Sequence, residues 1–145
     1  VNGFLDGLGD SKDKFKIVAQ QDGGAALDKS MELAEDIITA SPDMDAFFCI
    51  NDPSALGAAA AIKAANKTGK IGVYSIDASP DGKQALLDDE FTAVACQVPV
   101  QIADYSFKEA VKYVNGDTKI DEKKVYLDSH LVSKDEAEKT LKEWQ

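Results

Sequence analysis

Three apolar runs of the sequence are each followed directly by a short hydrogen-bonding side chain. These side chains are Asn51, Asp77 and Gln97, which follow residues 45–50, 71–76 and 92–96. Asn and Gln both donate and accept hydrogen bonds, whereas an ionised Asp accepts them. Each hydroxyl of a sugar also donates and accepts, and none of these positions carries a cation for a phosphate. The set therefore favours a neutral sugar or polyol as ligand.

Helix capping is the alternative role for such residues. Asp and Asn at the start of a helix commonly accept hydrogen bonds from its free backbone N–H groups. Asp52 and Ser79 are the stronger cap candidates, because each directly precedes a proline suited to the first helical position. Asp77 lies three residues before Pro80, the predicted start of the next helix, so a role as its cap is less obvious. Three aligned polar positions on successive strands favour a binding site over three unrelated caps.

Strands and helices are predicted to alternate along the chain. Short apolar runs predict strands at residues 15–19, 45–50, 71–76 and 92–96, and helical periodicity predicts helices at 25–40, 53–66, 80–89 and 99–115. Ser133 and Glu136 predict a capping box for a last helix that ends near Trp144. Alternation with apolar strands predicts an α/β fold, a three-layer parallel sheet flanked by helices. Ligands of such sheets bind at the carboxyl ends of the strands.

Composition excludes several function classes. The chain has 145 residues, about one domain, and a formal net charge of −10 from 16 basic and 26 acidic residues. That balance argues against a nucleic-acid partner or an anionic membrane surface, which both need clustered cations. Cys49 and Cys96 lie in apolar strands and are predicted to be inert core thiols, and His130 has no partner at a recognisable catalytic or zinc spacing. The sequence predicts no catalytic residue, no metal site and no cofactor.

Three segments of the chain resemble the C-terminal half of ribose-type periplasmic sugar-binding proteins of ABC transporters, which have the type 1 periplasmic binding fold. The segments are Asn51–Ala58 (NDPSALGA), Tyr74–Gly82 (YSIDASPDG) and Ala95–Ala103 (ACQVPVQIA), and residues 39–43 fit as well. The resemblance covers essentially the whole chain and is weakest over residues 134–145. It rests on the order of the segments, because no single one is diagnostic.

The resemblance implies a binding protein and not an enzyme. Its two lobes are joined by a hinge of three strands and close around one sugar. Residues 1–97 would form the C-terminal lobe without its first strand, residues 98–128 would belong to the other lobe, and residues 129–145 would cross back and end in the terminal helix. Asn51, Asp77 and Gln97 would hydrogen-bond the sugar hydroxyls.

The resemblance also implies partners and a location. The partners are the membrane subunits of an ABC permease. The location is periplasmic or otherwise extracytoplasmic, with a lipid anchor at the cell surface as one form of it. The chain would be roughly the latter half of a longer exported protein, and its unpaired strand edges predict dimerisation or exchange of a segment between copies. Residues 22–27 lack the aromatic side chain that many relatives direct to the sugar, so a pentose, a hexose or a related polyol all remain open.

Two other function classes share the architecture. The effector-binding domain of a lactose-repressor-type transcription regulator would carry its helix-turn-helix upstream, whereas a transport protein would carry an export signal there. An enzyme of flavodoxin-like or sugar-isomerase type would need a general base or nucleophile beside the strand ends. The predicted rim supplies acceptors and amides instead.

Overall fold

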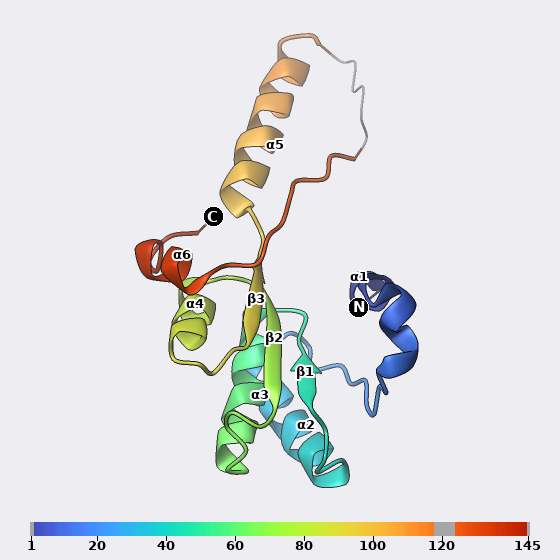
Figure 1. Ribbon diagram of the computed structural model, residues 1–145. Coiled ribbons are helices and arrows are strands. Elements are labelled where there is room, and N and C mark those ends of the chain that lie inside the picture. The colour runs from blue at the N-terminus through green and yellow to red at the C-terminus, as the bar shows by residue number, and fades with distance from the viewer. Residues whose placement is uncertain (1, 118–123, 145) are drawn as a thin grey trace.

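A sheet of three parallel strands lies at the centre of the molecule (Figure 1). The computed structural model describes residues 2–117 and 124–144. The strands are β1 (Ala46–Phe48), β2 (Gly72–Asp77) and β3 (Ala93–Cys96), in the order β1-β2-β3. Helices precede, separate and follow the strands, so the α/β fold and the parallel sheet predicted from the sequence are confirmed.

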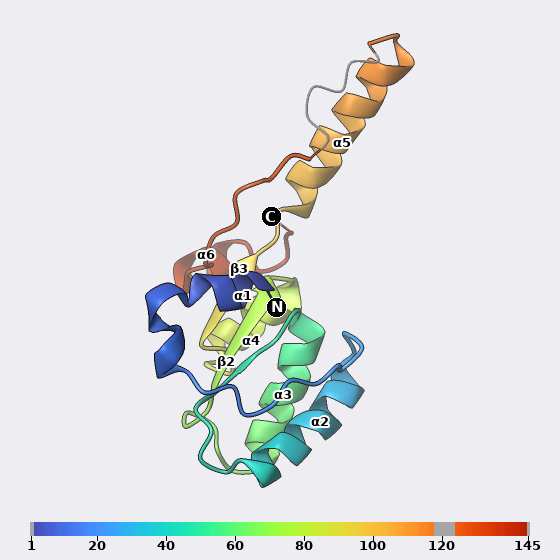
Figure 2. The same cartoon turned by 90° about the vertical axis from the view of Figure 1, so that its right-hand side faces the viewer.

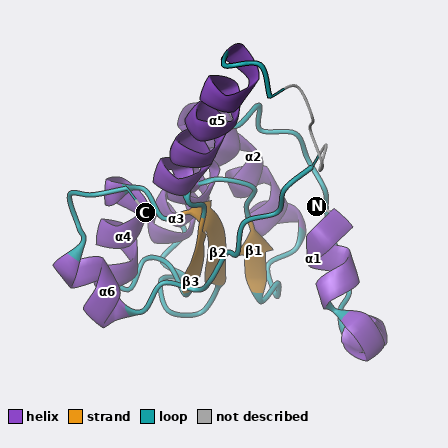
Figure 3. Cartoon of the chain, turned by 90° about the horizontal axis from the view of Figure 1, so that it is seen from above, coloured by secondary structure: helices purple, strands orange, loops and turns teal. Residues whose placement is uncertain are grey.

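The helices flank this sheet. They are α1 (Asn2–Gly7), the 3-10 helix η1 (Gly9–Lys14), α2 (Leu27–Ala40), α3 (Asp52–Ala64), α4 (Pro80–Leu87), α5 (Pro99–Val114) and α6 (Lys134–Lys139). α2 and α3 lie together on one side of the sheet, α4 and α6 lie beside β3, and α1 lies near β1 (Figures 1 and 3). Phe4 of α1 stacks on Phe48 of β1 with 4.3 Å between the ring centroids.

Small residues let α2 and α3 approach closely. α3 buries Ala55, Ala58 and Ala61 almost completely. A Cβ atom added at Gly57 would lie 2.4 Å from the carbonyl oxygen of Leu27 in α2. Such a contact is far inside van der Waals distance, so the two helices can pack in this way only because residue 57 has no side chain.

The strand predicted at residues 15–19 is wrong. This segment has extended backbone but is assigned to no strand, and Phe15, Ile17 and Val18 are all exposed. A β-strand needs a neighbouring strand for its N–H and C=O groups. No described strand pairs with this segment, because the sheet contains β1, β2 and β3 alone. The segment therefore has the apolar residues and the extended backbone of a strand, but it lacks the hydrogen bonds to a neighbouring strand.

α5 projects away from the rest of the described chain, and residues 124–129 run back beside it (Figures 1 and 2). None of its residues is buried, although it carries the exposed apolar side chains Val100, Ile102, Tyr105, Phe107, Val111, Tyr113 and Val114. The returning chain rejoins the sheet through an antiparallel bridge between Leu131 and Ala95. No helix in the described ranges is both long and apolar enough to cross a membrane.

A buried lysine fixes the C-terminal segment to α4. Lys83 is 0% exposed, and its Nζ donates to the carbonyl oxygens of Thr140 at 2.6 Å and Glu143 at 2.5 Å. Burial lowers the pKa of Lys83, and the carboxylate of Glu143 acts in the opposite direction. Ser133 caps α6 as predicted, but the helix ends at Lys139, so its predicted extension to Trp144 is wrong.

Candidate functional site

The carboxyl ends of the three strands lie at one edge of the sheet. Phe48 is in register with Tyr74, and Asp77 is in register with Cys96. Gln97 comes one residue after this last pair, and its backbone N–H donates to the carbonyl oxygen of Asp77 at 3.2 Å. Asp77, the last residue of β2, and Gln97, the first residue after β3, therefore meet at the edge where ligands of parallel α/β sheets bind.

Asp77 and Gln97 form a side-chain pair at this edge. Gln97 Nε2 donates to Asp77 Oδ1 at 2.6 Å. Burial raises the pKa of Asp77, the negative charge of Asp52 raises it further, and the hydrogen bond from Gln97 opposes both. Each side chain keeps hydrogen-bonding capacity for a ligand, because a carboxylate accepts several bonds and the Gln97 amide also has an oxygen acceptor.

Asn51 lies at the end of β1 and supports the local fold. Its Oδ1 accepts from the backbone N–H of Ser54 at 3.1 Å, which makes it the N-cap of α3. Its Nδ2 donates to the carbonyl oxygen of Ala25 at 3.3 Å. These bonds use one of its two N–H groups. The structure thus brings Asp77 and Gln97 into contact and places Asn51 after the adjacent strand, engaged with its own helix.

The two predicted caps have different outcomes. Ser79 is the N-cap of α4, since its Oγ accepts from the backbone N–H of Gly82 at 3.1 Å. The prediction for Asp52 is wrong, because the cap of α3 is the preceding residue, Asn51. Asp52 instead points toward β2 and the start of α4, where Ser75 and Ser79 hydrogen-bond it. The sequence reasoning missed this role, and its one signal was an acidic residue close after an apolar run, at the first position of α3.

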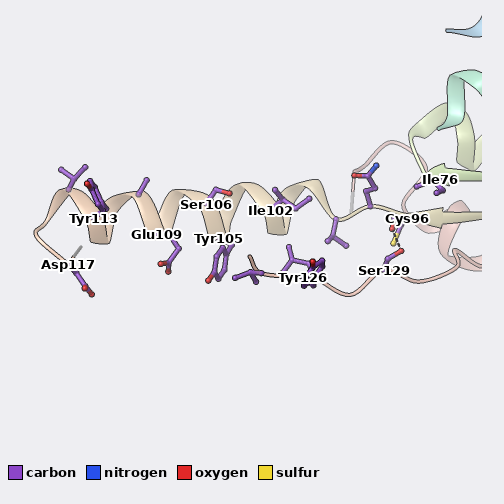
Figure 4. A pocket seen from close by; sticks show the side chains of 16 residues that line it. Ile76, Cys96, Ile102, Tyr105, Ser106, Glu109, Tyr113, Asp117, Tyr126 and Ser129 are labelled. Carbon is purple, nitrogen blue, oxygen red and sulfur yellow. Dashed lines mark hydrogen bonds between the residues drawn. The ribbon is translucent and has the colours of Figure 1, made fainter. Parts of the chain in front are cut away.

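A cavity of about 760 Å³ lies between α5 and residues 125–129 and reaches the polar edge at Gln97 (Figure 4). Ile102, Tyr105 and Tyr113 of α5 line one wall, and Tyr126 lies opposite. Gln97 belongs to the lining, but Asn51 and Asp77 do not. Its walls are largely apolar and aromatic, so it differs in chemistry from the edge that carries Asp77.

The cysteines are buried and unpaired. Cys49 is buried, as predicted for a core residue, and burial raises its pKa to about 12, which disfavours the reactive thiolate at neutral pH. Cys96 Sγ lies 3.3 Å from Nδ1 of His130, whose Nε2 lies 2.9 Å from Oε1 of Glu136. Within residues 2–117 and 124–144, no group of three or more His, Cys, Asp or Glu side chains is placed to hold a metal ion.

Comparison with known proteins gives one family. The model for the periplasmic binding protein domain matches residues 1–118. The chain is 34% identical over 104 residues to the ribose import binding protein of Salmonella typhimurium, covering 72% of this chain and 35% of that protein. It is 32% identical over 109 residues to the D-ribose/D-allose-binding protein of Pseudomonas aeruginosa, covering 75% of this chain and 34% of that protein.

Solved structures of sugar-binding proteins have the same fold. A galactofuranose-binding protein matches 96% of this chain and 48% of its own length, with a TM-score of 0.86 and 30% identity. The Caulobacter myo-inositol-binding protein matches 94% of this chain and 47% of its own, with a TM-score of 0.85 and 27% identity. The chain spans about a third of the length of the curated relatives and about half that of the solved structures. The sequence match over residues 1–118, together with this fold, shows that the chain belongs to the periplasmic binding protein domain family, whose members here are solute-binding proteins of type 1 fold.

Proposed function

We propose that this chain is part of the solute-binding component of a sugar ABC importer and binds a neutral sugar or polyol at the carboxyl ends of β1, β2 and β3. The observation that carries the proposal is the pair of Asp77 and Gln97 at this edge, joined at 2.6 Å. A carboxylate beside an amide offers acceptors and donors at a spacing suited to neighbouring hydroxyl groups. Asn51 would complete the set from β1 through its second N–H group.

The ligands named for the relatives support this chemical class. They include ribose and D-allose among the curated relatives, and galactofuranose and myo-inositol among the solved structures. All of these are uncharged molecules with several hydroxyl groups. An edge built from amides and one carboxylate fits that common feature, and the choice among the sugars would fall to groups outside Asn51, Asp77 and Gln97.

The proposal includes a second lobe. Residues 1–97 would form one lobe, 98–128 would pack with the other, and 129–145 would return to the first. The exposed apolar face of α5 supports this division, because a helix that carries Ile102, Tyr105 and Phe107 needs a surface to cover it. A sugar held by both lobes favours the closed state, since it binds that state better than the open one.

The remaining parts of the proposal concern the whole protein. It would deliver the sugar to the membrane subunits of an ABC permease from the periplasm or the outer cell surface, either free or held by a lipid anchor. The curated relatives support this setting, since they include import binding proteins.

Calorimetric titration of the full-length protein with ribose, D-allose, myo-inositol and ribose 5-phosphate tests the function. We expect at least one of the three neutral ligands to bind with micromolar affinity or better. Ribose 5-phosphate should bind at least tenfold more weakly than ribose. The carboxylate of Asp77 repels a phosphate group, and neither Asn51 nor Gln97 carries a positive charge to bind it. Tighter binding of the phosphate than of every neutral ligand would contradict the proposed site, as would no binding of any neutral ligand.

The isolated 145-residue chain is expected to self-associate. β1 has a paired strand on one side only in the described sheet, and α5 exposes its apolar face. Both features favour pairing with a second copy when the other lobe is absent. Sedimentation equilibrium should give a dimer or larger species at micromolar concentration. A monomer at about 100 µM, roughly a hundredfold higher concentration, would contradict this expectation.

A further inference from the structure

Asp52 is a buried carboxylate whose partners lie on either side of Asp77. Its Oδ1 accepts from Ser75 Oγ at 2.6 Å. Its Oδ2 accepts from both the backbone N–H and the Oγ of Ser79, each at 2.7 Å. Ser75 comes two residues before Asp77 and Ser79 two residues after it, so a single carboxylate holds both ends of residues 75–79, which form the end of β2 and the turn into α4.

The turn needs such a clamp. Asp77 has φ of 124° and Ala78 has φ of 56°, so two consecutive residues with side chains occupy backbone conformations that favour glycine. Residues held in such conformations persist when the surrounding structure fixes them. The three hydrogen bonds of Asp52 fix this turn on both sides of Asp77 in the sequence, and the bond from Gln97 holds the Asp77 side chain itself.

The site around Asp52 is shaped for a carboxylate. Asp52 is 1% exposed, and its carboxylate accepts three hydrogen bonds that stabilise its buried charge. A Cβ atom added at Gly82 in the first turn of α4 would lie 2.1 Å from Asp52 Oδ2. Only glycine at residue 82 leaves room for the carboxylate at this point.

We infer that Asp52 is a positioning residue of the sugar site, which holds the carboxylate of Asp77 in the orientation that meets the ligand and sets the electrostatic field around it. This inference rests on the proposed function. Asp52 itself is enclosed by its serine partners and does not touch the ligand. Its action on the sugar passes through Asp77, and that route distinguishes it from a residue that only stabilises the fold.

A double-mutant cycle on the full-length protein tests this dependence on Asp77, with ribose, D-allose or myo-inositol as probe, whichever binds the parent protein most tightly. Asp52→Ala should weaken binding at least tenfold by calorimetry. In the background of Asp77→Ala, where the positioned group is already gone, the same substitution should change affinity less than twofold. Unchanged affinity for Asp52→Ala alone, or equal losses in both backgrounds, would overturn the inference.

The pH dependence of binding gives a second readout that does not require the alanine variant to fold. Among the described residues, Asp52 from α3 is the charged group that acts on Asp77, and Gln97 after β3 is its neutral partner. Protonation of Asp77 removes an acceptor, so binding should weaken as pH falls through its pKa. The charge of Asp52 raises that pKa. Asp52→Asn removes the charge while its amide can still meet both serine hydroxyls, so the acid limb should move to lower pH.

An acid limb at unchanged pH in Asp52→Asn would overturn the inference. Asp81→Asn is the matched control, because Asp81 is an exposed acid in the first turn of α4, and its acid limb should stay where it is in the parent protein. The proposed function fails separately, if the parent protein binds none of the neutral ligands. Binding by the parent protein with an additive cycle would reject the role of Asp52 and leave the sugar site in place.

Discussion

Replacing Asp77 with alanine in the full-length protein is expected to weaken sugar binding at least tenfold, which corresponds to about 1.4 kcal/mol. An ionised acceptor forms hydrogen bonds roughly twice as strong as a neutral one, and alanine also leaves Gln97 without its 2.6 Å partner. Calorimetry measures the loss. Asp81→Ala, which removes an exposed acid four residues later, should bind as the parent protein does. Equal affinities for Asp77→Ala and the parent would remove Asp77 from the site.

The same carboxylate should cost the unliganded protein stability. Burial, with Asp52 in addition, raises the pKa of Asp77 above its value in the unfolded chain. Between these two pKa values the folded state binds more protons than the unfolded state, so this group makes the free energy of unfolding fall as pH rises through that interval. Asp77→Asn keeps an oxygen for Gln97 and removes the charge. Its melting temperature without sugar should therefore exceed that of the parent at pH 7 and approach it in acid.

Gly57→Ala is expected to lower the free energy of unfolding by about 2 kcal/mol, the typical cost of forcing extra atoms into a packed interface less the gain in helix propensity. The new methyl group would lie 2.4 Å from the carbonyl oxygen of Leu27 and 2.8 Å from the backbone nitrogen of Met31. Both neighbours are main-chain atoms of α2, so relief requires the two helices to move apart.

Chemical denaturation of the parent and the variant measures this loss. Gly3→Ala is the matched control, because Gly3 lies in α1 and no atom lies within 4 Å of an added Cβ there. It should be neutral or slightly stabilising, as expected for alanine in a helix. A loss for Gly57→Ala no larger than that of Gly3→Ala would show that α2 and α3 accommodate the methyl group.

The parallel sheet could be predicted from the sequence because its strands are short apolar runs between amphipathic or alanine-rich helices. Residues 15–19 show where that reasoning stops. Phe15, Ile17 and Val18 have the composition of a strand, but pairing depends on a neighbour that composition does not report. The hydrophobic pattern describes one segment at a time, whereas a β-ladder requires hydrogen bonds between two segments.

The candidate site was predictable to a similar degree. Residues after parallel strands meet at one edge, and this geometry brought Asp77 to Gln97. It could not assign Asn51 and Asp52, because both types are good caps and the choice depends on Ser75 and Ser79, which lie 23 and 27 residues after Asp52. Contacts at such separations arise from the packing of α3 against β2 and α4. The sequence pattern around Asp52 alone does not predict them.

The buried ammonium group of Lys83 makes the described C-terminal residues sensitive to truncation. Two of its acceptors are carbonyl oxygens of Thr140 and Glu143, so trimming even the last half-dozen residues would strand a cation in the interior. Residues 140–143 are thus an integral part of the structure around α4, although much of their surface is exposed.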